Sequence, residues 1–187
     1  MLSVTPPLSD QDHVRGDPCA IVTLIEYGSY QCPHSAAIQP ALARLLKRYP
    51  TGLRHVFRHF PLDITQPVSE LVAEAAEFAA SCGLFWHMHA MLFAHRDTLS
   101  FPVIFTFADR VGLPHNGLRD ALATGAFAAR VRQDFARGVL SGVDGTPTFF
   151  IGGHRQPGSA SLDALDAGVH AAIERSGEGA GGRRLQG

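Results

Sequence analysis

The order of strand-like and helix-like segments limits the fold of this chain more than any other feature of its sequence. Residues 21–27 (IVTLIEY) form an apolar, β-branched run that predicts a buried strand. Residues 33–49 carry apolar side chains at helical spacing, and residues 53–60 predict a second strand that stops at Pro61. The first part of the chain therefore predicts a β-α-β unit, whose strands pair in parallel through a right-handed crossover.

The middle of the chain is predicted to be helical, and strands return only near the C-terminus. Glycine and proline residues punctuate this region in the way that ends helices. The predicted helices are residues 68–82, 84–96, 102–111, 116–124 and 126–138. Residues 148–151 (TFFI) then predict a strand, and residues 154–156 predict a short strand that pairs with it. Ser161 is predicted to cap the N-terminus of a final helix. This layout predicts a block of helices inserted into a small α/β sheet.

The segments divide the chain into four parts. We expect an N-terminal arm at residues 1–16, an α/β domain made of residues 17–63 and 140–175, an inserted helical domain at residues 64–139, and a tail at residues 176–187. The tail is expected to be disordered, because it is rich in Gly and Arg and poor in apolar residues. A length of 187 residues, 45% of them apolar, fits one compact unit with an insertion.

Charge and hydropathy exclude several classes of partner. The formal net charge is −1, from 16 basic and 17 acidic residues, so neither nucleic acid nor a membrane is an expected partner. Residues 1–10 lack the basic and apolar regions of a secretory signal, and no apolar run approaches the ~18 residues that span a bilayer. We therefore expect a cytoplasmic protein, or a periplasmic one if a leader has been removed.

The cysteines and histidines do not form a pattern typical of metal binding. The chain has 3 cysteines, which are too few and too far apart for a zinc site or a disulfide framework. His55 and His59 share one face of a predicted strand, but no third ligand stands at a suitable spacing. No bound metal is expected.

Cys32 lies just after the first predicted strand and just before the first predicted helix, so its sulfur is expected at a helix N-terminus. Unpaired backbone N–H groups and the positive end of the helix dipole stabilise a thiolate there. Pro33 suits the first helical turn, and a protonated His34 adds positive charge. Such surroundings lower the pKa of cysteine thiols from about 8.5 into a range of roughly 3.5–7.5. Since the thiolate is the reactive form, Cys32 is predicted to be a nucleophile.

Residues 32–35 (Cys-Pro-His-Ser) resemble the Cys-Pro-His-Cys motif of the DsbA-like branch of the thioredoxin superfamily. Other segments resemble this family in the same order: residues 57–61 the strand before its inserted domain, residues 85–89 an aromatic-rich helix of that insertion, and residues 145–150 its cis-proline loop. The resemblance covers roughly residues 10–173. It implies a thioredoxin-like α/β fold, with a central mixed sheet flanked by helices and an inserted all-helical domain.

The resemblance also implies roles for single residues. Cys32 would be the nucleophile, and His34 would stabilise its thiolate. Glu26 stands where the family carries an acid near the active site, and it would manage protons. Pro147 stands at the family's cis-proline, and the backbone of Thr146 would pair with an extended substrate, as in strand addition. The substrate-binding residues implied in this way are Pro33, Thr146 and Pro147.

Ser35 replaces the second cysteine of the family motif, and this replacement changes the predicted chemistry. Thiol–disulfide exchange passes through a mixed disulfide, which the second thiol normally resolves. The Ser35 hydroxyl is too basic to attack near neutral pH, and it can only donate a hydrogen bond to the Cys32 thiolate. We therefore expect a monothiol oxidoreductase that forms mixed disulfides with protein or small-molecule thiols. Glutathione as a co-substrate, another external thiol or a more distant cysteine of the chain would release the mixed disulfide, and no cofactor would be bound permanently.

Two other functions would use the same site. Glutathione could be activated there for transfer to an electrophile, as in some thioredoxin-fold transferases. Alternatively, the domain could have lost its redox activity and bind extended peptides beside Pro147. The missing second cysteine favours this last function, whereas the presence of Cys32, Glu26 and Pro147 together disfavours it. A serine engineered in place of cysteine would also give this sequence. For Glu26, the alternative to a proton carrier is a strand residue on a solvated face.

Overall fold

The computed structural model describes residues 8–62, 68–158 and 161–181, with side chains up to residue 177 in the last segment. The elements in chain order are β1 (His13–Gly16), β2 (Val22–Gly28), α1 (Pro33–Arg48), β3 (Leu53–His59), α2 (Ser69–Ser81), α3 (Phe85–Ala94), the 3₁₀ turn η1 (Arg96–Thr98), α4 (Phe101–Val111), α5 (His115–Thr124), α6 (Ala128–Leu140), β4 (Thr148–Ile151), β5 (His154–Arg155) and α7 (Leu162–Gly181). All the helices and strands expected from the sequence are present. The thioredoxin-like fold class is confirmed.

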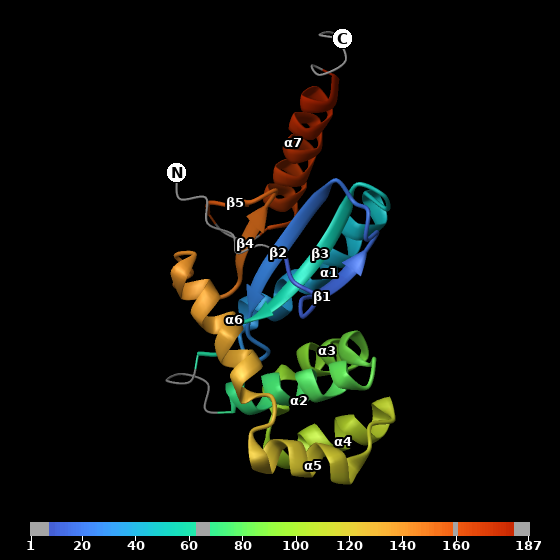
Figure 1. Cartoon of the computed structure of the whole chain (residues 1–187), viewed down its shortest axis with the longest axis vertical. Helices are drawn as coiled ribbons and strands as arrows, with labels where there is room; N and C mark the ends of the chain where they lie inside the picture. Colours follow the sequence, from blue (N-terminus) through green and yellow to red (C-terminus); the bar gives the residue numbers. More distant parts are fainter. Residues whose placement is uncertain (1–7, 63–67, 159–160, 182–187) are drawn as a thin grey trace. The chain divides into compact units, whose positions relative to one another are not determined.

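The five strands form one mixed sheet in the order β1-β3-β2-β4-β5 (Figure 1). β1 runs antiparallel to β3, and β4 runs antiparallel to β5. β2 and β3 point in the same direction, as their arrows in Figure 1 show. β2 lies in the middle of the sheet and is buried along almost its whole length, as its continuous apolar run predicts.

Contacts within the chain define two compact units, and each is described by itself. The sheet unit consists of residues 1–26, 38–58 and 148–187, and the helical unit consists of residues 27–37 and 59–147. The helical unit therefore includes the end of β2 and the first turn of α1. The sequence analysis assigned both of these segments to the α/β domain, so the observed division differs from the predicted one at this point.

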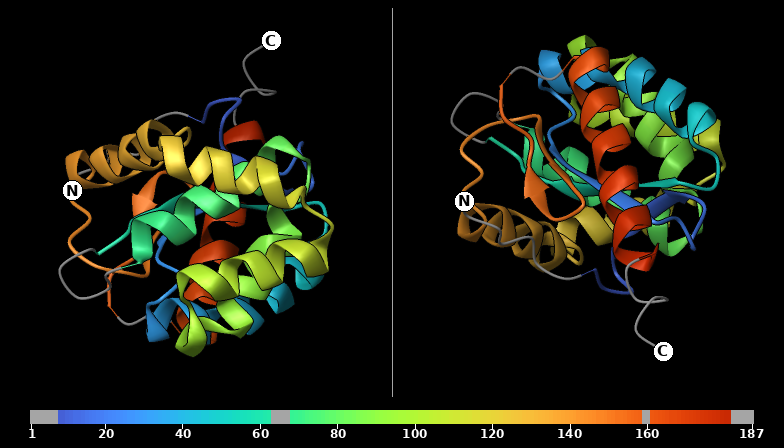
Figure 2. Two further views of the ribbon diagram at one scale, coloured as in Figure 1. Left: turned by 90° about the horizontal axis from the view of Figure 1, so that it is seen from below. Right: turned by 90° about the horizontal axis from the view of Figure 1, so that it is seen from above.

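The core of the sheet unit lies between the strands, α1 and α7. Its buried members are Val22, Leu24, Ile38, Leu42, Leu45, Leu53, Phe149, Ile151, Leu165, Val169 and Ala172. The two helices lie side by side, since Tyr49 donates a hydrogen bond to Asp166 Oδ1 at 3.0 Å and Arg48 pairs with the other carboxylate oxygen at 2.9 Å. The right-hand view of Figure 2 shows α7 crossing over the strands.

In the helical unit, α2 packs against α3, α4, α5 and α6 (Figure 2, left). Ala75, Ala76 and Ala79 of α2 are fully buried, and their small side chains allow the neighbouring helices to approach closely. Burial raises the pKa of Glu74 in α2, whereas the backbone N–H groups of Phe127 and Ala128 at the start of α6 act in the opposite direction.

β1 was not predicted from the sequence. Its residues pair with β3 in a register that sets His13 opposite Phe57 and Gly16 opposite Arg54. A strand of 4 residues is too short to show a clear alternation of apolar and polar side chains. It is held by the backbone groups that β3 offers at the edge of the sheet, and this partner is far away in the sequence.

The predicted disorder of residues 176–187 is wrong as far as residue 181, because α7 continues to Gly181. Extending a helix costs little once its first turns are fixed by packing, and α7 is anchored by its buried face. Ser176 also donates a hydrogen bond to the Ala172 carbonyl at 2.9 Å. Residues 182–187 lie outside the described residues. Among the described residues, no helix combines the length and the hydropathy that crossing a membrane requires.

Candidate active site around Cys32

Cys32 is the residue that caps the N-terminus of α1. Its carbonyl oxygen accepts the Ala36 N–H at 3.1 Å, which is the first hydrogen bond of the helix. Its own N–H donates to the Ser29 carbonyl at 3.1 Å and closes the turn that leads out of β2. Pro33 occupies the first helical position, where no N–H is needed. The predicted place of this cysteine at a helix start is confirmed.

The Cys32 thiol lies against the loop that precedes β4. Its Sγ donates a hydrogen bond to the Thr146 carbonyl oxygen at 3.2 Å, and the Thr146–Pro147 peptide bond is cis. The fold thus brings together two predicted site residues that are 114 positions apart. This contact requires a proton on the sulfur, because a carbonyl oxygen can only accept. Cys32 is only 4% exposed, so a substrate reaches the sulfur only when the contact opens.

The remaining residues of the motif differ in exposure. Pro33 and His34 are exposed, whereas Ser35 is fully buried. The Ser35 hydroxyl accepts a hydrogen bond from the Ser29 N–H at 3.5 Å, so it is tied to the turn before the nucleophile. The predicted hydrogen bond from Ser35 to a Cys32 thiolate stays a prediction.

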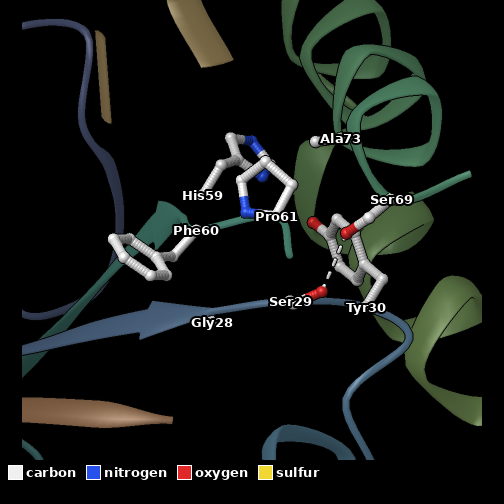
Figure 3. A pocket seen from close by; sticks show the side chains of 8 residues that line it. All are labelled: Gly28, Ser29, Tyr30, His59, Phe60, Pro61, Ser69 and Ala73. Carbon is white, nitrogen blue, oxygen red and sulfur yellow. Dashed lines mark hydrogen bonds between the residues drawn. The ribbon is translucent and has the colours of Figure 1, made fainter. Parts of the chain in front are cut away.

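Ser29 also connects this turn to the first turn of α2. Its hydroxyl lies 2.9 Å from the hydroxyl of Ser69, as the dashed line in Figure 3 shows. The two serines border a hollow of about 140 Å³, which includes its open mouth. The hollow is lined by Gly28, Ser29, Tyr30, His59, Phe60, Pro61, Ser69 and Ala73. Neither Cys32 nor Thr146 lines it, so the sulfur of Cys32 does not belong to this hollow.

Tyr30 fixes the turn to the aromatic core of the helical unit. Its hydroxyl lies 3.2 Å from Nδ1 of His89, a buried residue of α3. Its ring centroid lies 4.8 Å from that of Phe93 and 5.9 Å from that of His59. Because of these contacts, the turn that carries Cys32 belongs to the helical unit, although it directly follows β2 of the sheet.

Glu26, the predicted acid, belongs to a closed ring of hydrogen bonds in the sheet unit. Gln39 Nε2 donates to both of its carboxylate oxygens, at 2.9 and 3.2 Å, and His55 Nε2 lies 3.1 Å from Oε2. Arg15 completes the ring by donating to His55 Nδ1 at 2.9 Å and to Gln39 Oε1 at 3.5 Å. Glu26 is fully buried. The alternative interpretation, a strand residue on a solvated face, is therefore wrong.

The bond from Arg15 determines which nitrogen of His55 carries the proton. A guanidinium nitrogen can only donate, so Nδ1 of His55 accepts, and the ring proton of the neutral histidine is on Nε2. Nε2 then donates to Glu26. Burial raises the pKa of Glu26 to about 8, and the Gln39 hydrogen bond and the charge of Arg15 act in the opposite direction. The predicted transfer of protons between Glu26 and Cys32 stays a prediction.

Sequence reasoning missed the partners of Glu26. Arg15 comes from the unpredicted edge strand, and His55 lies 40 positions further along the chain. One signal for such a partner was available in α1, where the polar Gln39 directly follows Ile38, a residue of the buried face of this helix. Sequence reasoning also passed over Gln31, whose side-chain oxygen is buried directly before the nucleophile.

A five-stranded mixed sheet, a cysteine at the start of α1, a cis-proline before β4 and helices between β3 and β4 together define a thioredoxin fold with a helical insertion, as in DsbA. The chain belongs to the thioredoxin family, whose model, described as "Thioredoxin", matches residues 8–171. This confirms the resemblance that was inferred from the motifs.

Solved structures of this class superpose well on the chain. BdbD from Bacillus subtilis in its oxidised form has a TM-score of 0.80 at 19% identity, and the match covers 88% of this chain and 94% of that one. A thioredoxin-like oxidoreductase from Silicibacter pomeroyi has a TM-score of 0.77 at 25% identity, covering 89% and 94%. Wolbachia pipientis alpha-DsbA1 has a TM-score of 0.78 at 18% identity, covering 91% and 94%.

Curated relatives with higher identity are much longer than this chain. The Na(+)/H(+) antiporter NhaA 3 of Salinispora tropica is 42% identical over 173 residues, which are 92% of this chain and 26% of the relative. The Na(+)/H(+) antiporter NhaA 1 of Mycobacterium sp. is 37% identical over 171 residues, which are 88% of this chain and 28% of the relative. The chain therefore spans about a quarter of the length of these relatives.

Proposed function

We propose that this domain catalyses thiol–disulfide exchange with Cys32 as its single reactive thiol. The observation that carries this proposal is the place of Cys32, which caps α1 while its sulfur contacts the Thr146 carbonyl at 3.2 Å. The positive end of the α1 dipole would favour the thiolate once the contact opens. The similarity to a thioredoxin-like oxidoreductase of known structure supports the same reaction class.

The reaction proceeds in two balanced steps. The Cys32 thiolate first attacks one sulfur of a disulfide, so that a bond forms between Cys32 and that sulfur. The other sulfur leaves as a thiolate with the electron pair of the broken S–S bond. An external thiolate, from glutathione or a protein, then attacks the mixed disulfide and releases Cys32 as a thiolate. The protein ends in the oxidation state in which it began, so it exchanges disulfides without net oxidation or reduction.

The Thr146 carbonyl would link substrate binding to activation. In the resting state this oxygen accepts the Cys32 S–H. A main-chain N–H of an extended substrate that pairs with the same oxygen, as in strand addition, would displace the thiol. The sulfur would then be free to lose its proton, and it would lie beside the bound chain.

The test uses variants that each retain one thiol. The chain carries 3 cysteines, and Cys19 and Cys82 are exposed, so the variant Cys19→Ser/Cys82→Ser leaves Cys32 alone. The matched control, Cys19→Ser/Cys32→Ser, leaves only the exposed Cys82, which lies at the C-terminal end of α2 and not at a helix N-terminus. The substrate is a peptide whose single cysteine forms a mixed disulfide with glutathione. Release of the peptide thiol is followed by chromatography in the presence of reduced glutathione.

We expect the Cys32 variant to accelerate release at least about tenfold over the uncatalysed rate, and the Cys82 variant to leave that rate unchanged. Equal rates for the two variants would refute the proposal. Binding of the peptide without any exchange would refute it as well, and would instead identify a peptide-binding domain without redox activity. Formation of a thioether with an electrophile, in place of exchange, would identify a transferase.

A further inference from the structure

Ser29 joins the turn that carries Cys32 to two helices. Its carbonyl oxygen accepts the Cys32 N–H at 3.1 Å, and its own N–H donates to Ser35 Oγ of α1 at 3.5 Å. Its hydroxyl lies 2.9 Å from the hydroxyl of Ser69, the first residue of α2 (Figure 3). Because the Ser29 carbonyl is bonded to the Cys32 N–H, a displacement of Ser29 either moves the nucleophile or breaks this bond.

The bond to Ser69 is the shorter of these two links between Ser29 and helix side chains. Well-formed hydrogen bonds have donor–acceptor distances of about 2.5–3.2 Å, so the 3.5 Å bond from Ser29 to Ser35 is weak. The hydroxyls of Ser29 and Ser69 belong to buried residues, and a hydrogen bond is electrostatically stronger in such surroundings than in water. Ser69 therefore restrains Ser29 more firmly than Ser35 does.

Packing adds little restraint where the turn faces the hollow of about 140 Å³. This hollow is lined by residues 28–30, among others, and by residues of α2 (Figure 3). A side chain that borders a hollow has fewer neighbouring atoms to resist its displacement, so the hydrogen bond of Ser29 carries more of the restraint. Tyr30 is held separately, by His89 of α3, so the turn stays attached to the helical unit if the serine bond is lost.

We propose that Ser69 is a positioning residue for Cys32: through Ser29, it holds the thiol in its contact with the Thr146 carbonyl and thereby sets how often the sulfur becomes accessible. In this contact, at 3.2 Å, the sulfur is buried, and an attack on any reagent requires the contact to open. The inference rests on the proposed exchange activity for its role in function, and it names the residue that controls access to the same site.

The test measures how fast iodoacetamide alkylates Cys32, followed by mass spectrometry over a range of pH. The background variant is Cys19→Ser/Cys82→Ser, in which Cys32 is the remaining thiol. Ser69→Ala removes the hydroxyl, whereas Ser69→Thr keeps it and places its extra methyl group at a position that borders the hollow. Ser81→Ala is the matched control, because it removes an exposed serine hydroxyl from the last turn of the same helix.

We expect Ser69→Ala to raise the alkylation rate about fivefold at pH values where the thiol is protonated, since the loss of one net hydrogen bond makes opening that much more frequent. The plateau at high pH should stay unchanged, because a thiolate cannot donate to the carbonyl and the contact is already lost. Ser69→Thr and Ser81→Ala should keep the original profile. An unchanged profile in Ser69→Ala would overturn the inference, and so would an equal rise at every pH, which would indicate general loosening of the fold.

A double-mutant cycle tests whether the effect passes through Ser29. Ser29→Ala removes the other hydroxyl of the pair and should raise the rate by the same factor. The variant with both substitutions should show no further increase, because the two changes remove one interaction. Increases that multiply in the double variant would show that the serines act independently, and this result would refute the assignment.

Exchange kinetics separate this inference from the proposed function. With bis(2-hydroxyethyl) disulfide and glutathione as substrates, Ser69→Ala should raise kcat/KM about fivefold as well, because the first attack also needs the open state. Faster alkylation of Ser69→Ala in a protein that exchanges no disulfides would support the positioning role although the proposed function fails. Exchange that proceeds while Ser69→Ala leaves the alkylation profile unchanged would refute the positioning role alone.

Discussion

At the scale of single residues, the ionisable side chains of Cys32 and Glu26 are held in opposite ways. Cys32 donates a hydrogen bond to a single carbonyl oxygen of a loop, and under the proposed function one main-chain N–H from a substrate would replace that contact. Glu26 is held by Gln39, His55 and, through them, Arg15, so its surroundings change only if several hydrogen bonds break together. We therefore expect a ligand to act on the contact of the thiol, and pH to act on stability through the carboxyl of Glu26.

The raised pKa of Glu26 predicts how stability depends on pH. In the unfolded chain this carboxyl titrates near 4.5, and in the folded protein near 8. Between these values the folded state retains a proton that the unfolded state has lost. The free energy of unfolding should therefore fall as pH rises from about 4.5 to about 8, with a slope of up to about 1.4 kcal/mol per pH unit from this residue.

Glu26→Gln should remove this part of the pH dependence and stabilise the protein at pH 8, because an amide is not ionised by a rise in pH. Urea unfolding at several pH values measures the effect, as the difference between the variant and the unchanged protein. Glu174→Gln, at an exposed position of α7, is the matched control and should keep the original slope. A Glu26→Gln profile parallel to that of the unchanged protein would contradict the assignment.

At the scale of elements, the close approach of α6 to its neighbours depends on one glycine. A Cβ at Gly138 would lie 2.7 Å from Cδ2 of Phe60 and 3.1 Å from Cδ1 of Tyr27. Phe60 cannot easily move away, because its ring stacks on Phe135 of α6 with centroids 4.5 Å apart. The absence of a side chain at this position therefore allows α6 to pack against the two aromatic rings.

Gly138→Ala should destabilise the protein by about 1–3 kcal/mol, although alanine is the better helix former. Gly177→Ala in α7 is the control, because a Cβ there would meet no atom within 4 Å. It should stabilise the protein by up to about 1 kcal/mol. Thermal unfolding of both variants measures the difference. A gain in stability at both positions would show that α6 can shift to accommodate a methyl group.

The elements that the sequence predicted are those whose signals are local. The apolar run of β2, the spacing of apolar residues in α1 and the turn residues between helices can each be recognised within a short window. β1 and the ring around Glu26 could not be recognised in this way, because β1 pairs with residues about 40 positions away and the ring partners Gln39 and His55 lie 13 and 29 positions from Glu26. The contact between Cys32 and Thr146 spans 114 positions, and only the resemblance to a known family pointed to it.

At the scale of the whole molecule, the proposed cycle differs from that of a two-cysteine motif, because residues 32–35 hold a single cysteine. With Ser35 in the first turn of α1, a mixed disulfide on Cys32 has no neighbouring thiol within the motif to resolve it. The proposed cycle therefore needs a second molecule, and its rate should depend on how much external thiol is present.

Ser35→Cys should convert this shared cycle into an internal one. Residue 35 is fully buried in the first turn of α1, three positions after Cys32, so the introduced thiol would be close to the Cys32 sulfur. With Cys19 and Cys82 changed to serine, the unchanged motif should turn over peptide disulfide at a rate proportional to added glutathione. The Ser35→Cys variant should release both thiols of the peptide disulfide without glutathione, the second as the introduced thiol attacks the mixed disulfide, and form an internal disulfide, seen by mass spectrometry as the loss of two hydrogens. The prediction is contradicted if the variant keeps the linear dependence on glutathione and forms no internal disulfide. Ser35 would then not be the reason that the cycle depends on a second molecule.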